Sequence, residues 1–253
     1  MQELDQLITR AAELICQANY AVAMTGAGHS TPSGIPDFRS PESGLWSQVD
    51  PMAVASLFAF RFRPQDFYDW IRPLAQTMLE AQPNPAHYAL ARLEAAGLIK
   101  SVITQNIDGL HQKAGSRRVH EVHGHLREAT CIRCYRVVPA GDLIEEFLTS
   151  GQVPRCACGG VMKPNVILFG EQLPLDVLAA ARQDTRACDL MLVIGSSLTV
   201  EPAADLPLMA LNQHAKLVIV NYQPTYLDER ADVLIHADLA EVMPRIADLA
   251  TGL

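Results

Sequence analysis

One stretch of the chain joins a short apolar run to a loop rich in glycine and proline. The apolar run covers residues 20–24, and the loop, residues 26–39, holds three glycines, two prolines, three hydroxyl side chains and an Asp–Arg pair. A strand that ends in a glycine-rich turn brings backbone N–H groups close to an anion, which is how dinucleotide pyrophosphates are bound. Gly26 and Gly28 begin the G-x-G-x-x-G pattern, but Thr31 stands at its next position. The stretch therefore predicts an unusual nucleotide-binding loop, with a plain tight turn as the alternative.

Strands and helices alternate along most of the chain. We expect strands at residues 20–25, 98–104, 166–169, 190–194, 217–220 and 233–235, and helices at 2–18, 87–96, 175–186 and 202–213. This alternation predicts an α/β fold with a doubly wound, Rossmann-like parallel sheet covered on both faces.

Two segments interrupt the alternation. Residues 40–86 are rich in aromatic residues and prolines and predict a module of short helices, whereas residues 126–165 carry four cysteines and one helix at 141–150. We expect residues 1–39, 87–125 and 166–253 to form a discontinuous nucleotide-binding domain of the Rossmann type. The helical module 40–86 and the cysteine-bearing module 126–165 would then form a smaller domain.

Composition limits the possible partners. The chain has 253 residues, 49% of them hydrophobic, which is enough for one large core and a smaller module. A formal net charge of −8 argues against nucleic-acid binding and favours a basic peptide. Residues 1–20 lack the apolar centre of a signal peptide, and no apolar run approaches the roughly 20 residues that cross a bilayer. We expect a cytoplasmic protein that binds neither membranes nor nucleic acid; its oligomeric state is not indicated.

Polar or glycine-rich turns follow four of the expected strands. They are Thr25 into Gly26, residues 102–104 into Gln105-Asn106-Ile107-Asp108, Ile194 into Gly195-Ser196-Ser197, and Val220 into Asn221. In a doubly wound sheet the carboxyl ends of the strands line one crevice, where nucleotides bind. Helix capping is an alternative role for Ser196 and Ser197. It accounts less well for residues 105–108, which we expect to face the crevice.

Four of the six cysteines form a pattern typical of a zinc site. Two residues separate Cys131 from Cys134, and after 21 intervening residues Cys156 and Cys158 follow with one residue between them. Two turns that each present a pair of thiolates supply the tetrahedral ligand set of zinc. Because four thiolates close the coordination shell, the expected zinc is structural. Four unrelated thiols, or a nearby histidine in place of one ligand, are the alternatives.

Three histidines lie in a segment with alternating side chains. A period of two places His123 and His125 on one face and His120 on the other. Imidazole has a pKa suited to base catalysis near neutral pH. Taken alone, each of these histidines is more often structural than catalytic, so the neighbouring motifs must identify a base.

Several motifs occur together in one order between about residues 14 and 239. They are residues 26–39, residues 104–111, His123-Gly124, the cysteine pairs, Phe169-Gly170-Glu171, residues 195–198 and Val220-Asn221. As a set they resemble the signature motifs of sirtuins, the NAD-dependent protein-lysine deacylases. The resemblance implies a Rossmann-type domain, a small domain built from the helical insert and a zinc ribbon, and a substrate cleft between the two.

The resemblance also implies roles for individual residues. His123 would be the general base, and Asn106 and Asp108 would line the nicotinamide pocket as catalytic residues. The residues expected to bind NAD are Gly26, Ala27, Gly28, Thr31, Asp37, Phe38, Arg39, Gln105, Asn106, Ile107, Asp108, His123, Gly195, Ser196, Ser197, Asn221, Asp238 and Leu239. Val166 and Phe169-Gly170-Glu171 would flank an acyl-lysine peptide that adds as a strand between the domains.

The implied reaction consumes NAD as an electrophile. The acyl oxygen attacks ribose C1′, nicotinamide leaves, and His123 accepts the proton of a ribose hydroxyl, which leads to O-acyl-ADP-ribose. A mono-ADP-ribosyltransferase or an NAD hydrolase on the same fold is the alternative.

Two positions depart from the family pattern. His29 stands where sirtuins usually have an aliphatic residue, and we expect it to be tolerated. Members that prefer succinyl-lysine carry Tyr-x-x-Arg, whereas here Tyr68 is followed three residues later by Ile71, with Arg72 one residue out of phase. One helical residue rotates a side chain by about 100°, and a guanidinium contact depends on direction. We therefore expect a preference for uncharged acyl groups, acetyl first and longer aliphatic chains next.

Overall fold

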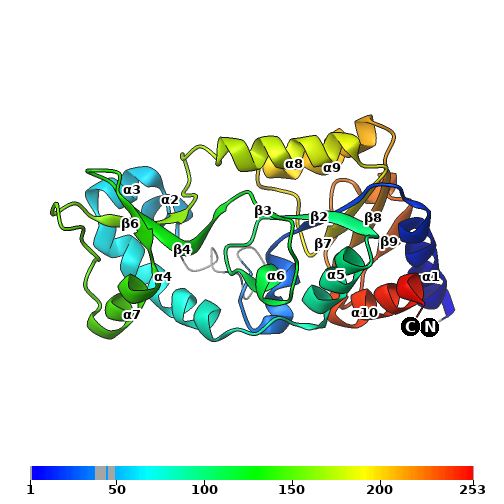
Figure 1. The fold of residues 1–253 in the computed structure, drawn as a ribbon, viewed down its shortest axis with the longest axis horizontal. Coiled ribbons are helices and arrows are strands. Elements are labelled where there is room, and N and C mark those ends of the chain that lie inside the picture. The colour runs from blue at the N-terminus through cyan, green and yellow to red at the C-terminus, as the bar shows by residue number, and fades with distance from the viewer. Residues whose placement is uncertain (1, 38–43, 45–48, 253) are drawn as a thin grey trace.

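The computed structural model describes residues 2–37, 44 and 49–252, which form two lobes side by side (Figure 1). The larger lobe contains a six-stranded sheet, and the smaller lobe contains a three-stranded sheet with several helices. The two ends of the chain lie together at the outer end of the larger lobe. Among the described residues, no helix combines the length and hydropathy of a membrane-spanning segment.

The six-stranded sheet is parallel throughout. Its strands are β1 (Ala21–Thr25), β2 (Ile99–Thr104), β3 (Val119–Glu121), β7 (Leu190–Ile194), β8 (Lys216–Val220) and β9 (Val233–Ile235), in the spatial order β3-β2-β1-β7-β8-β9. The chain winds outward from β1 in one direction and then, from β7, in the other. This doubly wound order confirms the expected α/β class, and it places a ligand crevice at the carboxyl ends of the central strands.

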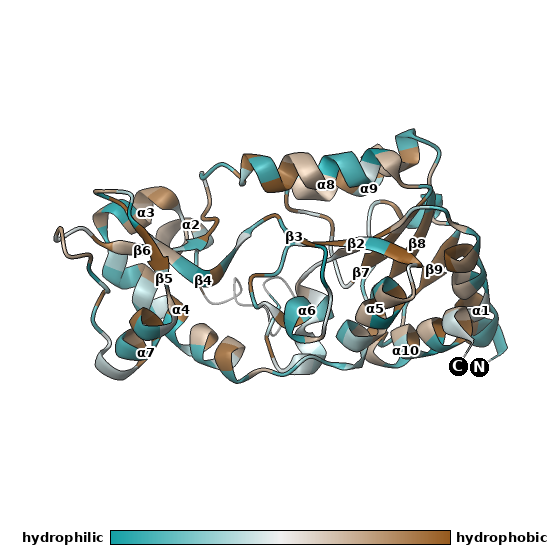
Figure 2. Cartoon of the chain, viewed as in Figure 1, coloured by the Kyte–Doolittle hydropathy of each residue, from teal (hydrophilic) through white to brown (hydrophobic). Residues whose placement is uncertain are grey.

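Helices cover both faces of this sheet. One face is packed by α1 (Gln2–Gln17), α5 (Pro85–Ala95) and α10 (Leu239–Thr251), and the other by α8 (Leu175–Ala187) and α9 (Leu206–Asn212). Every residue of β1 and β7 is buried, as expected for strands covered on both sides, and the strands are largely brown in Figure 2. The short helix α6 (Leu110–Lys113) follows β2.

The smaller lobe combines antiparallel strands with helices. Its strands are β4 (Gly124–Cys131), β5 (Val137–Pro139) and β6 (Met162–Val166), and its helices are α2 (Pro51–Val54), α3 (Leu57–Phe62), α4 (Pro64–Glu80) and α7 (Gly141–Ser150). Phe60, Phe67, Tyr68 and Phe147 pack ring against ring at its centre. Two excursions of the chain, one before β2 and one after β3, build this lobe.

Several elements differ from the expectation, among them β4, β5 and α6, which were not expected. The strand expected at 166–169 is wrong, because β6 ends at Val166 and Phe169 makes an isolated bridge to Ser56. The apolar run continues past β6 because residues 166–169 border a cavity. Helix α4 spans 17 residues and is longer than the short helices expected. Helix α10 was not expected, although its buried residues recur at i, i+3, i+4 and i+7; Pro244 within it obscures the pattern.

Candidate active site

Two glycine-containing loops touch at the carboxyl ends of β1 and β7. After β1 the chain forms two short 3₁₀ turns, η1 (Ala27–His29) and η2 (Thr31–Ser33). The backbone N–H of Gly28 donates to the carbonyl of Gly195 at 2.9 Å. A Cβ on Gly26 or Gly28 would lie 2.9 Å from that same carbonyl oxygen. The glycines are therefore required for the two backbones to approach each other at the crevice.

Asn106 and Asp108 are held against the first of these loops. The Asn106 side-chain amide donates to the Gly26 carbonyl at 2.9 Å and to Ser30 Oγ at 3.0 Å. The Ser30 hydroxyl donates in turn to Asp108 Oδ2 at 2.7 Å, and the Leu110 N–H donates to Asp108 Oδ1 at 2.9 Å. Burial raises the pKa of Asp108 despite these hydrogen bonds. The network fixes an amide and a carboxyl group side by side.

His123 lies in the short connection between β3 and β4, between the two lobes. Its Nδ1 is 3.1 Å from the Gln105 carbonyl, and its own carbonyl accepts from the Ile167 N–H at 2.9 Å. Because a carbonyl accepts only, Nδ1 carries the proton of the neutral ring and Nε2 carries the lone pair. A Cβ on Gly124 would lie 2.0 Å from the Asn165 carbonyl oxygen, so a glycine must follow this histidine. The imidazole is thus oriented with its basic nitrogen fixed as Nε2.

A cavity of about 630 Å³ runs between the lobes and brings together part of the expected site, including the three expected catalytic residues. The predicted residues on its wall are Ala27, Gln105, Asn106, Ile107, Asp108, His123, Val166, Phe169, Gly170 and Glu171. Helix α4 contributes a further apolar wall that sequence reasoning did not assign to the site, consisting of Phe67, Trp70, Ile71, Leu74 and Met78. The buried residues of α4 recur at helical spacing, and this pattern is the signal that was available in the sequence.

Several other expected NAD contacts among the described residues do not line the cavity. Ser196 Oγ accepts from Gln105 Nε2 at 2.9 Å, which joins the loop after β7 to the loop after β2. Thr31 is exposed and Ser197 is half-buried. Asn221, at the end of β8, is buried and donates through Nδ2 to the Gln223 carbonyl at 2.6 Å.

Five expected NAD contacts need separate mention. Asp238 caps the N-terminus of α10 by accepting from the Ala240 N–H at 2.8 Å, and the Leu239 side chain is buried in the large core. The structure does not bring these two side chains to the cavity wall. Asp37 is half-buried, and Phe38 and Arg39 lie outside the described residues.

The segment at residues 169–171 is attached to the small lobe by main-chain hydrogen bonds. The Leu57 N–H donates to the Phe169 carbonyl at 3.0 Å, and the Phe169 N–H donates to the Ala55 carbonyl at 2.9 Å. Glu171 accepts from the Leu168 N–H at 3.0 Å and pairs with Lys163 Nζ, also at 3.0 Å. The predicted peptide-binding residues therefore form one edge of the cavity.

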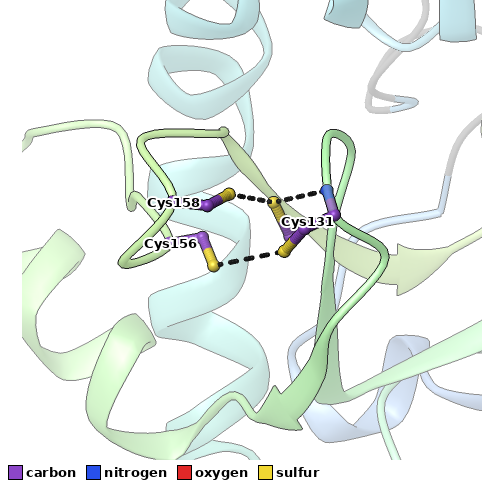
Figure 3. A group of neighbouring side chains, drawn as sticks. Cys131, Cys156 and Cys158 are labelled. Carbon is purple, nitrogen blue, oxygen red and sulfur yellow. Dashed lines mark hydrogen bonds between the residues drawn. The ribbon is translucent and has the colours of Figure 1, made fainter.

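The four clustered cysteines converge from separate turns. Cys131, Cys156 and Cys158 point toward one another in Figure 3, and the sulfurs of the four residues lie within 4.8 Å of one another. The Sγ separations are 3.5 Å for Cys131–Cys158 and 3.7 Å for Cys134–Cys156. Tetrahedral zinc with Zn–S bonds of about 2.3 Å needs sulfurs about 3.8 Å apart.

The surroundings of the sulfurs also suit a metal. The backbone N–H of Cys134 and that of Arg133 lower the pKa of the Cys131 thiol to about 6, which favours the thiolate. The four cysteines therefore fit a structural zinc ion, and none of them borders the cavity.

Comparison with known proteins assigns a family to this arrangement. A family model described as "Sir2 family" matches residues 26–202. The chain is 45% identical over 247 residues to the NAD-dependent protein deacylase 2 of Archaeoglobus fulgidus, covering 97% of this chain and 96% of the relative. It is 44% identical over 222 residues to the NAD-dependent protein deacetylase 1 of Geobacillus kaustophilus, covering 88% and 89%.

Solved structures agree with these relatives. A structure described under "Structural Basis for the Mechanism and Regulation of Sir2 Enzymes" superposes with a TM-score of 0.92 at 44% identity, covering 98% of this chain and 99% of the other. A Sir2 variant with a deacetylated p53 peptide and 3′-O-acetyl-ADP-ribose gives a TM-score of 0.90 at 41% identity over 95% and 97%. Sir2Af2 with a myristoylated histone peptide gives 0.84 at 39% identity over 98% of each chain. By sequence and by fold, the chain belongs to the Sir2 family.

Proposed function

We propose that this protein is an NAD-dependent protein-lysine deacylase that releases nicotinamide and O-acyl-ADP-ribose. The observation that carries the proposal is the convergence of His123, Asn106 and Asp108 on one cavity, beside the loops that follow β1 and β7. A dinucleotide site at the carboxyl ends of parallel strands and an oriented base at its border are the two requirements of this reaction. The related deacylases and deacetylases support the same assignment.

NAD would lie over the strand ends of the large sheet. The donors available there are amides and hydroxyls, which suit ribose and phosphate oxygens. They come from Gln105, Ser196, Ser197 and Asn221, in addition to the backbone of the glycine loops. NAD supplies the ribose carbon that receives the acyl oxygen.

The residues of this chain hold the reacting groups and move one proton. Asn106 and Asp108 would hold the nicotinamide amide, because the hydrogen bonds to Gly26 and Ser30 fix both side chains. His123 would accept a ribose hydroxyl proton at Nε2, since the Gln105 carbonyl holds the other proton at Nδ1. The predominantly apolar wall of the cavity would limit the entry of water, which would otherwise hydrolyse the activated sugar.

The acyl-lysine peptide would add along residues 169–171, with Val166 nearby, as a strand between the lobes. The acyl chain would then extend toward α4, whose wall residues Phe67, Ile71, Leu74 and Met78 are apolar. Arg72 points elsewhere, because its guanidinium donates to the Leu148 carbonyl. The surroundings of the acyl group therefore support acetyl and longer uncharged groups over succinyl.

The domain boundaries are part of the same proposal. The NAD-binding domain would comprise residues 1–39, 87–125 and 166–253, and the small domain residues 40–86 and 126–165. Two hydrophobic cores, one on the six-stranded sheet and one around α4, support this division, and Ile35, Leu110, Val166 and Leu168 of the larger domain also pack in the second core. None of the six cysteines forms a disulfide, which supports a reducing compartment such as the cytoplasm.

Mass spectrometry of an acetyl-lysine peptide incubated with the protein and NAD tests the proposed function. We expect the deacetylated peptide, nicotinamide and O-acetyl-ADP-ribose in equal amounts, and no product when NAD is omitted. Mass added to the protein or peptide as ADP-ribose would instead identify an ADP-ribosyltransferase. Free ADP-ribose with the acetyl-peptide unchanged would identify an NAD hydrolase.

A further inference from the structure

Three histidines from separate elements meet in the interior, next to the NAD loop but outside the cavity. His29 comes from η1, His87 from α5 and His111 from α6. Their ring centroids are 4.5 Å apart for His29–His87, 5.0 Å for His29–His111 and 4.9 Å for His87–His111. All three side chains are at most 1% exposed. We call these residues the histidine cluster.

Several ring nitrogens of the cluster are buried and have no hydrogen-bond partner among the described residues. They are both nitrogens of His29, Nε2 of His87 and Nδ1 of His111. Buried polar atoms are almost always hydrogen-bonded, since an unsatisfied one costs about 1–3 kcal/mol. Four such atoms in one place therefore point to a missing ligand rather than to ordinary core packing.

The outer nitrogens of the cluster are held by the surrounding structure. His111 Nε2 lies 2.9 Å from the Thr25 hydroxyl, which itself donates to Thr104 Oγ1. With the proton on Nε2, the Nδ1 of His111 directs its lone pair into the cluster. His87 Nδ1 is 3.3 Å from the Asn84 N–H, and the Asn84 side chain also donates to the His29 carbonyl at 2.8 Å. The contact to Thr25 is of the kind that orients imidazoles in metal sites, because there the outer ring nitrogen donates.

We propose that the histidine cluster binds one divalent transition-metal ion, such as zinc or cobalt, through three imidazole nitrogens. One ligand atom from each residue lies within 4.8 Å of the others. A tetrahedral ion with metal–nitrogen bonds of about 2.0–2.1 Å needs ligand atoms about 3.3 Å apart, so modest rotation of the rings closes the site. Neutral imidazoles without a carboxylate select zinc, cobalt, nickel or copper over magnesium or calcium.

The histidines are available as ligands because burial keeps them neutral. All three side chains are at most 1% exposed, which disfavours the charged imidazolium, so protons do not compete for the lone pairs. Binding at His87 Nε2 moves the ring proton to Nδ1 and gives up the long hydrogen bond from Asn84. One weak hydrogen bond is a small loss beside three metal–ligand bonds.

The proposed ion would join three parts of the large lobe. His29 lies between Gly28 and Ser30 of the NAD loop, while α5 and α6 belong to the helical layer and to the segment after β2. The ion would therefore anchor the NAD loop from behind. None of the three histidines borders the cavity, so this site is distinct from the proposed active site and from the four cysteines.

Metal analysis of the full chain purified from zinc-supplemented cells tests this proposal. We expect two zinc equivalents in the wild type, one at the cysteines and one at the histidine cluster. His29→Ile should contain one equivalent, whereas His214→Asn, at an exposed histidine with φ of 64°, should retain two. One equivalent in the wild type overturns the proposal even if His29→Ile does not fold, and so does a second equivalent that survives His29→Ile.

Cobalt identifies the ligands of the second ion. After expression in cobalt medium, the wild-type spectrum minus the His29→Ile spectrum should show weak d–d bands without sulfur-to-cobalt charge transfer, because the second site has no thiolate. A difference spectrum that contains thiolate charge transfer, or no difference at all, contradicts the proposal. These readouts do not depend on deacylase activity, so they remain valid if the proposed function fails.

Discussion

The backbone N–H of Gly28 donates a 2.9 Å hydrogen bond to the carbonyl of Gly195, so the loop after β1 rests on the loop after β7. A Cβ on Gly195 would lie 2.3 Å from the His29 backbone nitrogen, and φ at Gly195 is 62°. Gly195→Ala should therefore separate the two loops. We expect NAD affinity, measured by calorimetry, to fall at least about 10-fold, since a contact worth about 1.4 kcal/mol already has that effect.

Gly97→Ala is the matched control for this change. Gly97 also has a positive φ, 74°, but nothing within 4 Å of the added Cβ. The Gly97→Ala substitution should lower the free energy of unfolding by about 1–2 kcal/mol, the strain of a left-handed residue, and leave NAD affinity unchanged. Equal NAD affinity in the two variants would contradict the role given to the loop contact.

Replacement of the oriented base tests the proposed proton transfer. His123→Ala should lower kcat of deacylation by about 10²-fold or more, the usual contribution of a general base, while folding and zinc content stay intact. His125→Ala is the control, because His125 lies two residues further on and does not border the cavity. Near-normal turnover by His123→Ala would remove His123 from this role.

The acyl preference depends on which residue of α4 faces the cavity. Ile71 borders the cavity, whereas the Tyr68 hydroxyl donates to the Met162 carbonyl at 2.6 Å. Ile71→Arg would place a guanidinium at the Tyr-x-x-Arg spacing. We expect the ratio of desuccinylation to deacetylation on matched peptides to rise about 10-fold or more, the scale of one charge-assisted hydrogen bond.

Arg72→Gln serves as the control for the acyl preference. Arg72 donates to the Leu148 carbonyl and lies over the Phe147 ring, so its loss should leave the ratio of the two rates unchanged. Faster desuccinylation than deacetylation by the wild type would refute the assignment of uncharged acyl groups.

Removal of the cysteine-bound zinc should disrupt the structure of the small lobe more than that of the large lobe. Cys131→Ser breaks the tetrad that joins the turn after β4 to the turn before β6, so we expect loss of one zinc equivalent and of deacylation. Cys16→Ser, at an exposed thiol in α1, should change neither. Full activity after loss of the zinc would show that these cysteines do not hold the lobe together.

The buried carboxylate of Asp184 leads to a prediction of how the free energy of unfolding depends on pH. Burial favours a raised pKa for Asp184, but the Ser101 hydroxyl, hydrogen bonds from His120 and Tyr20, and the charge of Arg118 lower it. Because the folded-state pKa is below the unfolded value of about 3.9, the ionised carboxylate stabilises the protein above that pH. This stabilisation is lost as the pH falls through the folded-state pKa.

Asp184→Asn measures this contribution. We expect the free energy of unfolding to fall by about 1.5–3 kcal/mol at pH 7, the scale of hydrogen bonds to a charged group. In urea titrations the difference from the wild type should shrink as the pH is lowered below about 4. A difference that stays constant over that range would show that ionisation of Asp184 does not stabilise the fold.

The sequence predicted the elements whose buried positions can be recognised from the apolar spacing within one segment. The strands β7 and β9 and the helix α7 begin and end where their apolar spacing indicated. The convergence of the loops after β1, β2 and β7 followed from the sheet topology, because parallel strands end at one edge.

Features formed by residues far apart in the sequence could not be predicted from local patterns. His29, His87 and His111 are separated by 58 and 24 positions, and nothing near each of them indicates the other two. The cavity wall on α4 has an apolar spacing that predicts burial, but the spacing does not tell a core contact from a ligand contact. The apolar run at 166–169 was misread as a strand for the same reason.

The small lobe is built from two segments that lie far apart in the chain, so the ribosome makes one of them well before the other. Helix α4 leaves the ribosome well before its packing partners Phe147, Val161, Val166 and Leu168 have been made. Part of its apolar side, which borders the cavity in the folded protein, must therefore stay exposed while about 90 further residues are translated, a delay of several seconds at about 5–20 residues per second. The cavity-facing side of α4 is thus a surface that needs protection on the nascent chain.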